Sequence, residues 1–352
     1  MNKEILKSLI NTPSPSGYEQ CIQNLIYDTV EQYADEVDID GHGNVIAKID
    51  ACKSSIASTS HKNIMLAAHC DQIGLIVTHI DARGYISVES VGGWDPQQLV
   101  GQSVSIYNKK KSIDGIIGKK PIHLMKPEER TKASKITDLW IDIGAKDRKQ
   151  AMKNVSIGDY VTTKLNYQEM MNDKLVGTAM DDKAGVFACI EAFKQVAENK
   201  DKLSNTVFFV STVQEEVGTR GAITSTYDID PDIGIAVDVT FATDCPSHNP
   251  KEQGDVKMGA GPVIQLGPNI TPFIGKKMMK TAKKNKIPFQ VTASGRMTGT
   301  DARSIQISRS GVSTGLISIP NRYMHSGVEM VSLKDLTNIS SLLAKFCMRK
   351  FK

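Results

Sequence analysis

The sequence predicts an α/β protein in which helices flank a mixed central sheet, with a small all-β, barrel-like domain inserted into the chain. Apolar runs that are typical of buried strands alternate with helix-forming segments along most of the chain. Between Gly74 and about Leu165 this pattern stops, and turns divide the chain into short strand-length pieces. The earlier pattern then resumes. We therefore predict a main domain formed by residues 1–73 and 166–352, and an inserted β-barrel domain formed by residues 74–165.

Five strand-like runs of the main domain lead into polar residues. These runs are Asn63–Ala68, Val176–Met180, Val207–Val213, Ile233–Val237 and Gly315–Ile319. The polar residues that follow them are, in chain order, His69-Cys70-Asp71, Asp181-Asp182, Gln214-Glu215-Glu216, Asp238 and His325. In open α/β sheets, binding and catalytic sites form beyond the ends of the strands. The repetition of this pattern favours a site, although a glutamate pair or an aspartate pair is also common at a helix start.

Helical patterns fill the remaining parts of the main domain. An amphipathic helix is predicted from Asn2 to Ile10, and Ser16-Gly-Tyr-Glu19 has the pattern of a capping box with Ser16 as the N-cap. Further helices are predicted at about Val186–Glu198, Phe273–Asn285 and Leu333–Lys352.

Composition argues against several kinds of partner and location. The 352 residues are 40% hydrophobic and 23% charged, which is ordinary for a soluble globular protein. The net charge of +4 arises from mixed signs, which disfavours nucleic acid or an anionic membrane as a partner. No apolar run reaches the roughly 18 residues of a transmembrane helix, and the amino terminus lacks a signal-peptide core. The six cysteines are widely spaced and are predicted to be free thiols in a reducing cytoplasm.

The polar residues at the strand ends have the chemistry of a metal site. Two imidazoles and four carboxylates are available: His69, Asp181, Glu215, Glu216, Asp238 and His325. Nitrogen and oxygen ligands without thiolate suit zinc, cobalt or manganese. Two such ions about 3.5–4 Å apart, bridged by one carboxylate, would use five of the six groups and leave one glutamate as a general base. Asp71, two residues after His69 on a strand, could accept a hydrogen bond from the far ring nitrogen of that histidine.

The chain resembles the dinuclear-zinc aminopeptidases that are called tetrahedral (TET), glutamyl or deblocking aminopeptidases. The matching motifs are Ala68-His69-Cys-Asp71-Gln-Ile-Gly74, Thr178-Ala-Met-Asp181-Asp182-Lys183-Ala-Gly185, Gln214-Glu215-Glu216-Val-Gly218, Val237-Asp238-Val239-Thr240, Gly299-Thr-Asp301-Ala302 and Arg322-Tyr-Met-His325-Ser326.

The resemblance implies a role for each site residue. One metal ion is held by His69 and Asp238, and the other by Glu216 and His325. Asp181 bridges the two ions, Glu215 is the base, and Asp71 orients His69. It also implies that the inserted domain drives dimerisation and that dimers assemble into a dodecamer. Two departures are Gln72, where this family commonly has glutamate, and Arg296-Met-Thr298, where a glycine-rich stretch is usual.

The site chemistry leaves other functions open. A dinuclear amidohydrolase or a carboxypeptidase would use the same metal ligands and differ only in its substrate pocket. Similar proteins have been labelled endoglucanases, but glycoside cleavage normally needs two free carboxylates, and here the carboxylates are better explained as ligands. A non-catalytic assembly protein is disfavoured because all five ligands are present. The preferred terminal residue of a peptide substrate does not follow from the sequence.

Overall fold

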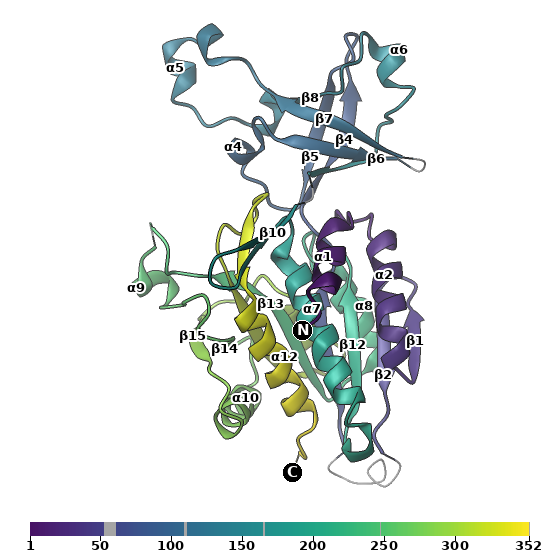
Figure 1. Cartoon of the computed structure of the whole chain (residues 1–352), viewed down its shortest axis with the longest axis vertical. Helices are drawn as coiled ribbons and strands as arrows, with labels where there is room; N and C mark the ends of the chain where they lie inside the picture. Colours follow the sequence, from purple (N-terminus) through teal and green to yellow (C-terminus); the bar gives the residue numbers. More distant parts are fainter. Residues whose placement is uncertain (53–60, 109–110, 165, 247, 352) are drawn as a thin grey trace.

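The computed structural model describes residues 1–52, 61–108, 111–164, 166–246 and 248–351, and the chain forms two units (Figure 1). The larger unit contains, among the described residues, an eight-stranded sheet. In spatial order its strands are β1 (Glu36–Ile39), β2 (Val45–Ile49), β12 (Thr206–Thr212), β3 (Asn63–His69), β13 (Ile233–Phe241), β16 (Ser313–Asn321), β14 (Val263–Leu266) and β15 (Gln290–Ala293).

The sheet is mixed, which confirms the predicted fold class. Its four central strands, β12, β3, β13 and β16, are parallel. The strand on each side of this group is antiparallel to its neighbour, since β2 pairs antiparallel with β12 and β14 with β16. Because the central strands run the same way, their carboxyl ends meet at one edge of the sheet.

Helices cover both faces of the sheet. One face carries α1 (Lys3–Asn11), α2 (Gln20–Val30), α7 (Met180–Ala197), α10 (Pro272–Lys284) and α12 (Leu333–Cys347), and the other carries α8 (Arg220–Ile229) and α11 (Ala302–Gln306). Shorter elements are η1 (Glu31–Tyr33), η4 (Lys200–Lys202) and α9 (Pro250–Gln253). None of the helices in the described ranges combines the length and the apolar character that crossing a membrane requires.

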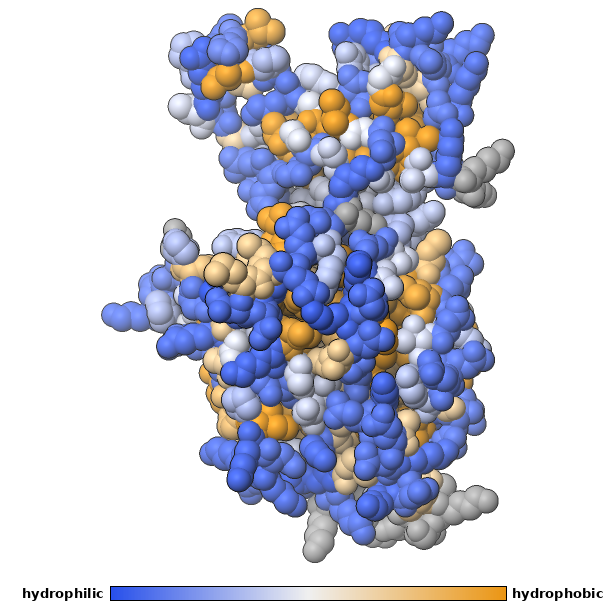
Figure 2. Space-filling model, viewed as in Figure 1, coloured by the Kyte–Doolittle hydropathy of each residue, from blue (hydrophilic) through white to orange (hydrophobic). Residues whose placement is uncertain are grey.

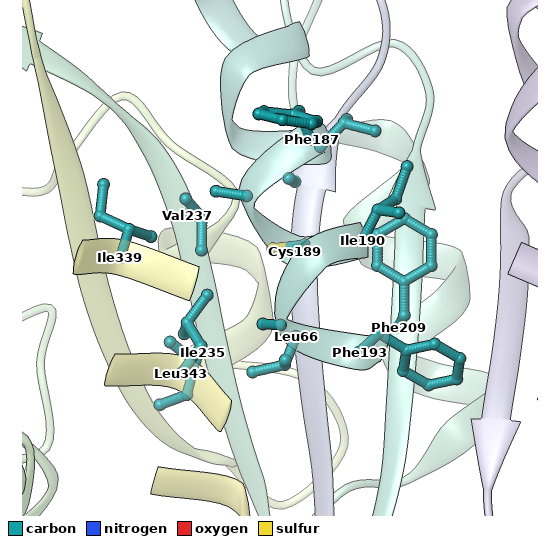
Figure 3. Close-up of a cluster of buried hydrophobic side chains, with 14 of the residues drawn as sticks. Leu66, Phe187, Cys189, Ile190, Phe193, Phe209, Ile235, Val237, Ile339 and Leu343 are labelled. Carbon is teal, nitrogen blue, oxygen red and sulfur yellow. The ribbon is translucent and has the colours of Figure 1, made fainter. Parts of the chain in front are cut away.

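Alternation along the strands separates two layers of apolar core. Leu66 of β3 packs with α7 and α12, whereas its neighbours Met65 and Ala67 pack toward α8 and α11. Figure 3 shows the first layer, where Phe193 of α7 lies beside Phe209 of β12. Burial on both faces explains why these strands are apolar almost throughout.

The smaller unit is a closed antiparallel barrel with its own apolar core. Its strands, in spatial order, are β4 (Gly74–Ile80), β5 (Ile86–Val91), β8 (Trp140–Asp142), β7 (Ser112–Gly118), β6 (Ser103–Tyr107) and β9 (Tyr160–Thr163). Short helices connect them: α4 (Pro96–Leu99), η2 (Ile122–Leu124), α5 (Pro127–Arg130), η3 (Ile136–Asp138) and α6 (Arg148–Ala151). The barrel lies at one end of the molecule, and the space-filling view shows the narrowing between the two units (Figures 1 and 2).

A third sheet lies between the barrel and the main sheet. It consists of β10 (Tyr167–Met170), β11 (Lys174–Gly177) and β17 (Glu329–Ser332), paired antiparallel. Strand β11 leads directly into α7, and β17 leads directly into α12. This sheet therefore fixes the amino-terminal ends of both helices beside the carboxyl edge of the main sheet.

Two helix predictions were wrong in detail. The capping box at Ser16 does not form: α2 begins at Gln20 with Glu19 as its N-cap, and the Ser16 hydroxyl instead donates to Asp71 Oδ2 at 2.6 Å. A tertiary hydrogen bond to a buried carboxylate has replaced the local one. The last helix ends at Cys347 rather than at Lys352, which lies outside the described residues.

Candidate active site

The structure brings the predicted polar residues together at the carboxyl edge of the parallel strands. His69 ends β3, Asp238 lies in β13, and the Glu215-Glu216 pair follows β12. His325 follows β16 after a short loop. Asp181 lies in the first turn of α7, where its backbone and that of Asp182 are not helical. All of them except Asp182 line one cavity of about 710 Å³.

Asp181 lies between the two histidines. Its Oδ1 atom is 3.1 Å from His69 Nε2, and its Oδ2 atom is 3.4 Å from His325 Nε2. A carboxylate with one oxygen facing each imidazole has the arrangement needed to bridge two cations.

Each histidine also has a second carboxylate beside it. His69 Nε2 lies 3.9 Å from Asp238 Oδ1, and His325 Nε2 lies 3.5 Å from Glu216 Oε1. The potential ligand atoms form two groups: His69, Asp182 and Asp238 in one, and Asp181, Glu216 and His325 in the other. Within each group these atoms lie within 4.8 Å of one another.

Backbone carbonyls fix the tautomers of both histidines. His69 Nδ1 is 3.0 Å from the carbonyl oxygen of Asp71, and His325 Nδ1 is 2.8 Å from that of Gly93. A carbonyl oxygen only accepts, so Nδ1 must donate, and the lone pair of a neutral ring is then on Nε2, facing the cavity. The sequence had indicated the Asp71 carboxylate as the acceptor, but its Oδ1 lies farther away, at 3.5 Å.

The Asp71 carboxylate instead holds the turn that carries the two glutamates. Its Oδ1 accepts from the backbone N–H of Glu215 at 2.9 Å, and its Oδ2 accepts from that of Glu216 at 3.2 Å. Asp71 is completely buried, and Gln214, which starts the turn, has a positive φ of 56°. A fixed charge that accepts successive N–H groups stabilises this uncommon backbone conformation.

Burial and mutual repulsion raise the pKa of most carboxylates in the site. The pKa of Glu215 is raised to about 10 by burial and by its neighbours Asp238, Asp301 and Glu216. The pKa of Glu216 is raised to about 8, chiefly by burial and by Asp181. Bound cations would compensate these charges, so the donor set fits divalent metal ions.

The pKa values of the adjacent residues Asp181 and Asp182 are shifted in opposite directions. Burial disfavours the ionised form of Asp181, but hydrogen bonds with His325 and His69 lower its pKa below the usual value. The pKa of Asp182 is raised well above its usual value by burial and by Asp238. Both carboxyl oxygens of Asp182 are buried and lack a hydrogen-bond partner among the described residues. The charge that faces both histidines is therefore on Asp181.

Several residues at the site were not predicted from the sequence. Glu329 of β17 is 1% exposed, and its oxygens accept from the backbone N–H groups of Asp181 at 2.8 Å and of His325 at 2.7 Å. Gly93, whose carbonyl positions His325, belongs to the inserted segment, for which no site residue was predicted from the sequence. No sequence signal marks Glu329 or Gly93. Asp301 belongs to the Gly299-Thr-Asp301-Ala302 motif, and its Oδ2 accepts from the Thr212 hydroxyl at 2.6 Å.

Gln72 and Thr298, which lie at the two departures from the motifs of the resembling family, both form hydrogen bonds near the site. Gln72 Oε1 accepts a 2.7 Å hydrogen bond from the completely buried Lys183, whose Nζ also donates to the carbonyl of Thr12. Lys183 thus has neutral partners, and burial lowers its pKa to about 7. Thr298 lines the cavity, where its hydroxyl donates to Asn269 Oδ1 at 2.6 Å.

Glu19 gives a pH-dependent prediction. It is 7% exposed, and burial and the Asp71 charge raise its pKa to about 7 from 4.5. The folded state therefore keeps the proton that the unfolded state loses near pH 4.5, and stability falls as the pH rises from 4.5 to 7. We expect the free energy of unfolding of Glu19→Gln to equal that of the wild type near pH 4.5. At pH 8 it should be larger by about 3 kcal/mol, since each pKa unit corresponds to about 1.4 kcal/mol. Thermal unfolding as a function of pH measures this difference.

The control for this experiment is Glu198→Gln, which neutralises an exposed carboxylate at the end of α7. We expect it to leave the pH profile unchanged. A constant difference between Glu19→Gln and the wild type across this pH range would contradict the prediction.

Comparison with known proteins identifies the family to which this site belongs. A model of the M42 glutamyl aminopeptidase family matches residues 43–342. The chain belongs to the M42 glutamyl aminopeptidase family. It is therefore an aminopeptidase, a hydrolase of peptide bonds, and the metal dependence of this family agrees with the two groups of potential ligands.

Relatives of this M42 family member match it over nearly its full length. A lysyl aminopeptidase from Pyrococcus furiosus is 38% identical over 99% of this chain and 97% of its own length. A TET aminopeptidase from a marine sediment archaeon (Thaumarchaeota) has a TM-score of 0.92 at 34% identity, covering 99% of this chain and 96% of that one. The Pyrococcus horikoshii TET1 peptidase, described as assembling into a tetrahedron or a large octahedral shell, has a TM-score of 0.85 at 32% identity, with 99% of both chains covered.

Proposed function

We propose that this aminopeptidase hydrolyses the N-terminal peptide bond at a centre of two divalent cations. The observation that carries this proposal is the position of Asp181, whose two oxygens face His69 Nε2 and His325 Nε2. In the proposal Asp181 bridges the ions, His69 and Asp238 hold one, and Glu216 and His325 hold the other. The donors are nitrogen and oxygen only, which suits zinc and also cobalt or manganese.

Metal analysis tests this assignment directly. Protein purified without chelator should contain two divalent ions per chain, and exhaustive chelation should abolish activity. Activity should then return on addition of zinc, cobalt or manganese. Full activity of a metal-free preparation would contradict the proposal.

In the proposed reaction, the cations and the side chain of Glu215 have different roles. When bound, the two cations supply Lewis acidity to the peptide carbonyl and to the attacking water. Glu215 takes the proton of the water and returns it to the leaving amine. Burial is the largest cause of its raised pKa, and the positive charge of bound cations would lower that pKa, so that the carboxylate is ionised before it takes the proton. The hydrogen bonds from the Glu215 and Glu216 N–H groups to Asp71 position the turn for this transfer.

An aminopeptidase is favoured over a carboxypeptidase by the family to which the chain belongs. The four carboxylates that line the cavity, Asp181, Glu215, Glu216 and Asp238, do not decide between the two, because two divalent cations would offset their charges. For an aminopeptidase, aminoacyl anilides should be cleaved, and peptides with a blocked amino terminus should not.

Another residue that lines the cavity gives a prediction about the first residue of the substrate. Arg303 of α11 lines the cavity and forms no ion pair within the part of the chain that the structure describes. A half-buried guanidinium without a carboxylate partner favours an acidic side chain. We expect Arg303→Gln to lower kcat/KM at least tenfold for a glutamyl anilide, with little change for a leucyl anilide.

Arg309→Gln is the matched control, because this arginine lies outside the cavity and pairs with Asp230 at 3.7 Å. The comparison should include a lysyl anilide, since one relative is named a lysyl aminopeptidase. A preference for the lysyl anilide that Arg303→Gln leaves unchanged would refute the acidic preference.

We also propose that the inserted unit 74–165 makes the dimer contacts of a dodecamer. The barrel and its connections expose Ile116, Ile122 and Leu124, at 57%, 59% and 69%. Figure 2 shows hydrophobic side chains on this end of the molecule, and a self-complementary contact would cover them. Replacing both Ile122 and Leu124 by aspartate should shift the particle to a smaller mass in sedimentation, with the fold retained. Unchanged mass would place the dimer contact elsewhere.

A further inference from the structure

Basic residues gather where α10 and α12 end side by side. The last turn of α10 contains Lys283 and Lys284, α12 contains Lys345 in its last turn, and Arg349 and Lys350 follow it. Arg349 Nη1 donates to the Thr281 hydroxyl at 3.1 Å, which links the two helices. Figure 1 shows α10 and the carboxyl-terminal end of α12 in the half of the molecule that lies away from the barrel.

Most of these residues line an open surface cavity that is separate from the active site. Its volume is about 480 Å³, and four cations line it: Lys284, Lys345, Arg349 and Lys350. Asn285 and Thr281 add neutral hydrogen-bonding groups. None of the lining residues is a carboxylate, among those that the structure describes. The surrounding sequence is also free of acid, because residues 272–300 and 336–352 contain no aspartate or glutamate.

Among the described residues, no carboxylate forms an ion pair with the cations that line this cavity. Lys277, on the preceding turn of α10, has its pKa lowered by partial burial and by the charges of Arg349 and Lys280. Its ammonium lies against the rings of Phe351 and Phe273, at 5.2 and 5.7 Å from their centroids. Cations in the last turn of a helix also interact with the helix dipole, which accounts for Lys283, Lys284 and Lys345 individually. It does not account for Arg349 and Lys350, which lie beyond the end of α12.

Arg349 is held in place and keeps donors free. The side-chain amide of Asn205 donates to the carbonyls of Cys347 at 2.7 Å and of Arg349 at 2.8 Å, which fixes this end of the chain. The Nε atom of Arg349 is buried and has no hydrogen-bond partner among the described residues. That atom is out of reach of a ligand, but the half-buried guanidinium lines the cavity and forms no ion pair among the described residues, which makes it a partner for phosphate oxygens.

We propose that this cavity binds a small soluble anion that carries two or more phosphate groups. Its volume lies within the usual range of about 300–1,000 Å³ for small-molecule sites. Four converging cations match a charge larger than that of one phosphate group. A strand of nucleic acid would instead need an extended groove, and the net charge of only +4 gives the chain little general attraction for it.

Calorimetric titration of the intact, metal-loaded protein tests the proposal, with fructose 1,6-bisphosphate as the probe because it chelates metal ions weakly. We expect saturable binding of one molecule per chain, weaker binding of a sugar monophosphate, and none of fructose. The double variant Lys284→Gln, Lys350→Gln should weaken binding of the bisphosphate at least tenfold. The matched control, Lys149→Gln with Lys153→Gln, removes two exposed lysines of the barrel and should leave binding unchanged.

Two results would overturn the inference. One is the absence of saturable bisphosphate binding to the wild type. The other is equal binding by the cavity variant and the barrel control. Tighter binding of a single-stranded oligonucleotide than of the bisphosphate, lost in the cavity variant, would also overturn it in favour of a nucleic-acid surface. Aminopeptidase activity should stay unchanged in both double variants, which shows that each remains folded.

Discussion

Glu215→Gln is expected to lower kcat by about 10²–10⁴-fold, the usual contribution of a general acid–base group. The amide has nearly the shape of the carboxylate but cannot take a proton from water. Because Glu215 is not one of the five proposed ligands, the two metal ions should remain bound. The measurement is kcat on an aminoacyl anilide together with metal content of the same preparation.

The control for this variant is Glu252→Gln, which changes an exposed glutamate that lines the same cavity but belongs to neither group of potential ligands. It should retain kcat to within a fewfold. Near-normal activity of Glu215→Gln would remove this residue from the mechanism, whereas a loss of metal would make it a ligand and not the base.

Asp181→Asn is expected to abolish activity by emptying the metal centre. Each oxygen of Asp181 faces one histidine, so this substitution removes the negative charge shared by both proposed cation positions. An amide is a much poorer ligand for a hard divalent ion than a carboxylate. The metal content should therefore fall from two ions per chain to one or none, as measured by elemental analysis.

The adjacent Asp182 supplies a control of the same type. It belongs with His69 and Asp238 in one group of potential ligands, but unlike the five proposed ligands it does not line the cavity, and asparagine has nearly its shape. Asp182→Asn should keep both ions and most of the activity. If Asp182→Asn loses metal while Asp181→Asn keeps it, the bridging assignment is reversed.

The hydrophobic pattern was enough to predict the central strands. Asn63–Ala68 and Ile233–Val237 are apolar throughout because each is buried on both faces, and both became central parallel strands. Their polar endings then indicated one shared site, because the carboxyl ends of parallel strands meet. The short strands after Gly74 likewise indicated an all-β unit, and these strands close into a barrel.

Local patterns failed where a distant part of the chain provides the partner. Ser16 has the sequence of an N-cap, whose hydroxyl would accept from a backbone N–H of the helix. Its hydroxyl instead donates to the buried carboxylate of Asp71, and a hydrogen bond to a charged acceptor is stronger. Glu329 lies in an ordinary edge strand, and only the pairing of β17 with β11 brings it to the Asp181 N–H group. Gly93 contributes a carbonyl oxygen, which every residue possesses, so no residue type could have marked it.

The sequence by itself determined which chemical groups lie at the ends of the strands, because residue type and strand period are local properties. Only the tertiary structure decided that Asp181 presents one oxygen to each histidine, and that Asp71 accepts the N–H groups of the glutamate turn. Those directions depend on how β11, α7 and the barrel pack against the sheet. Such packing is set by the contacts of the whole chain, and no short segment contains it.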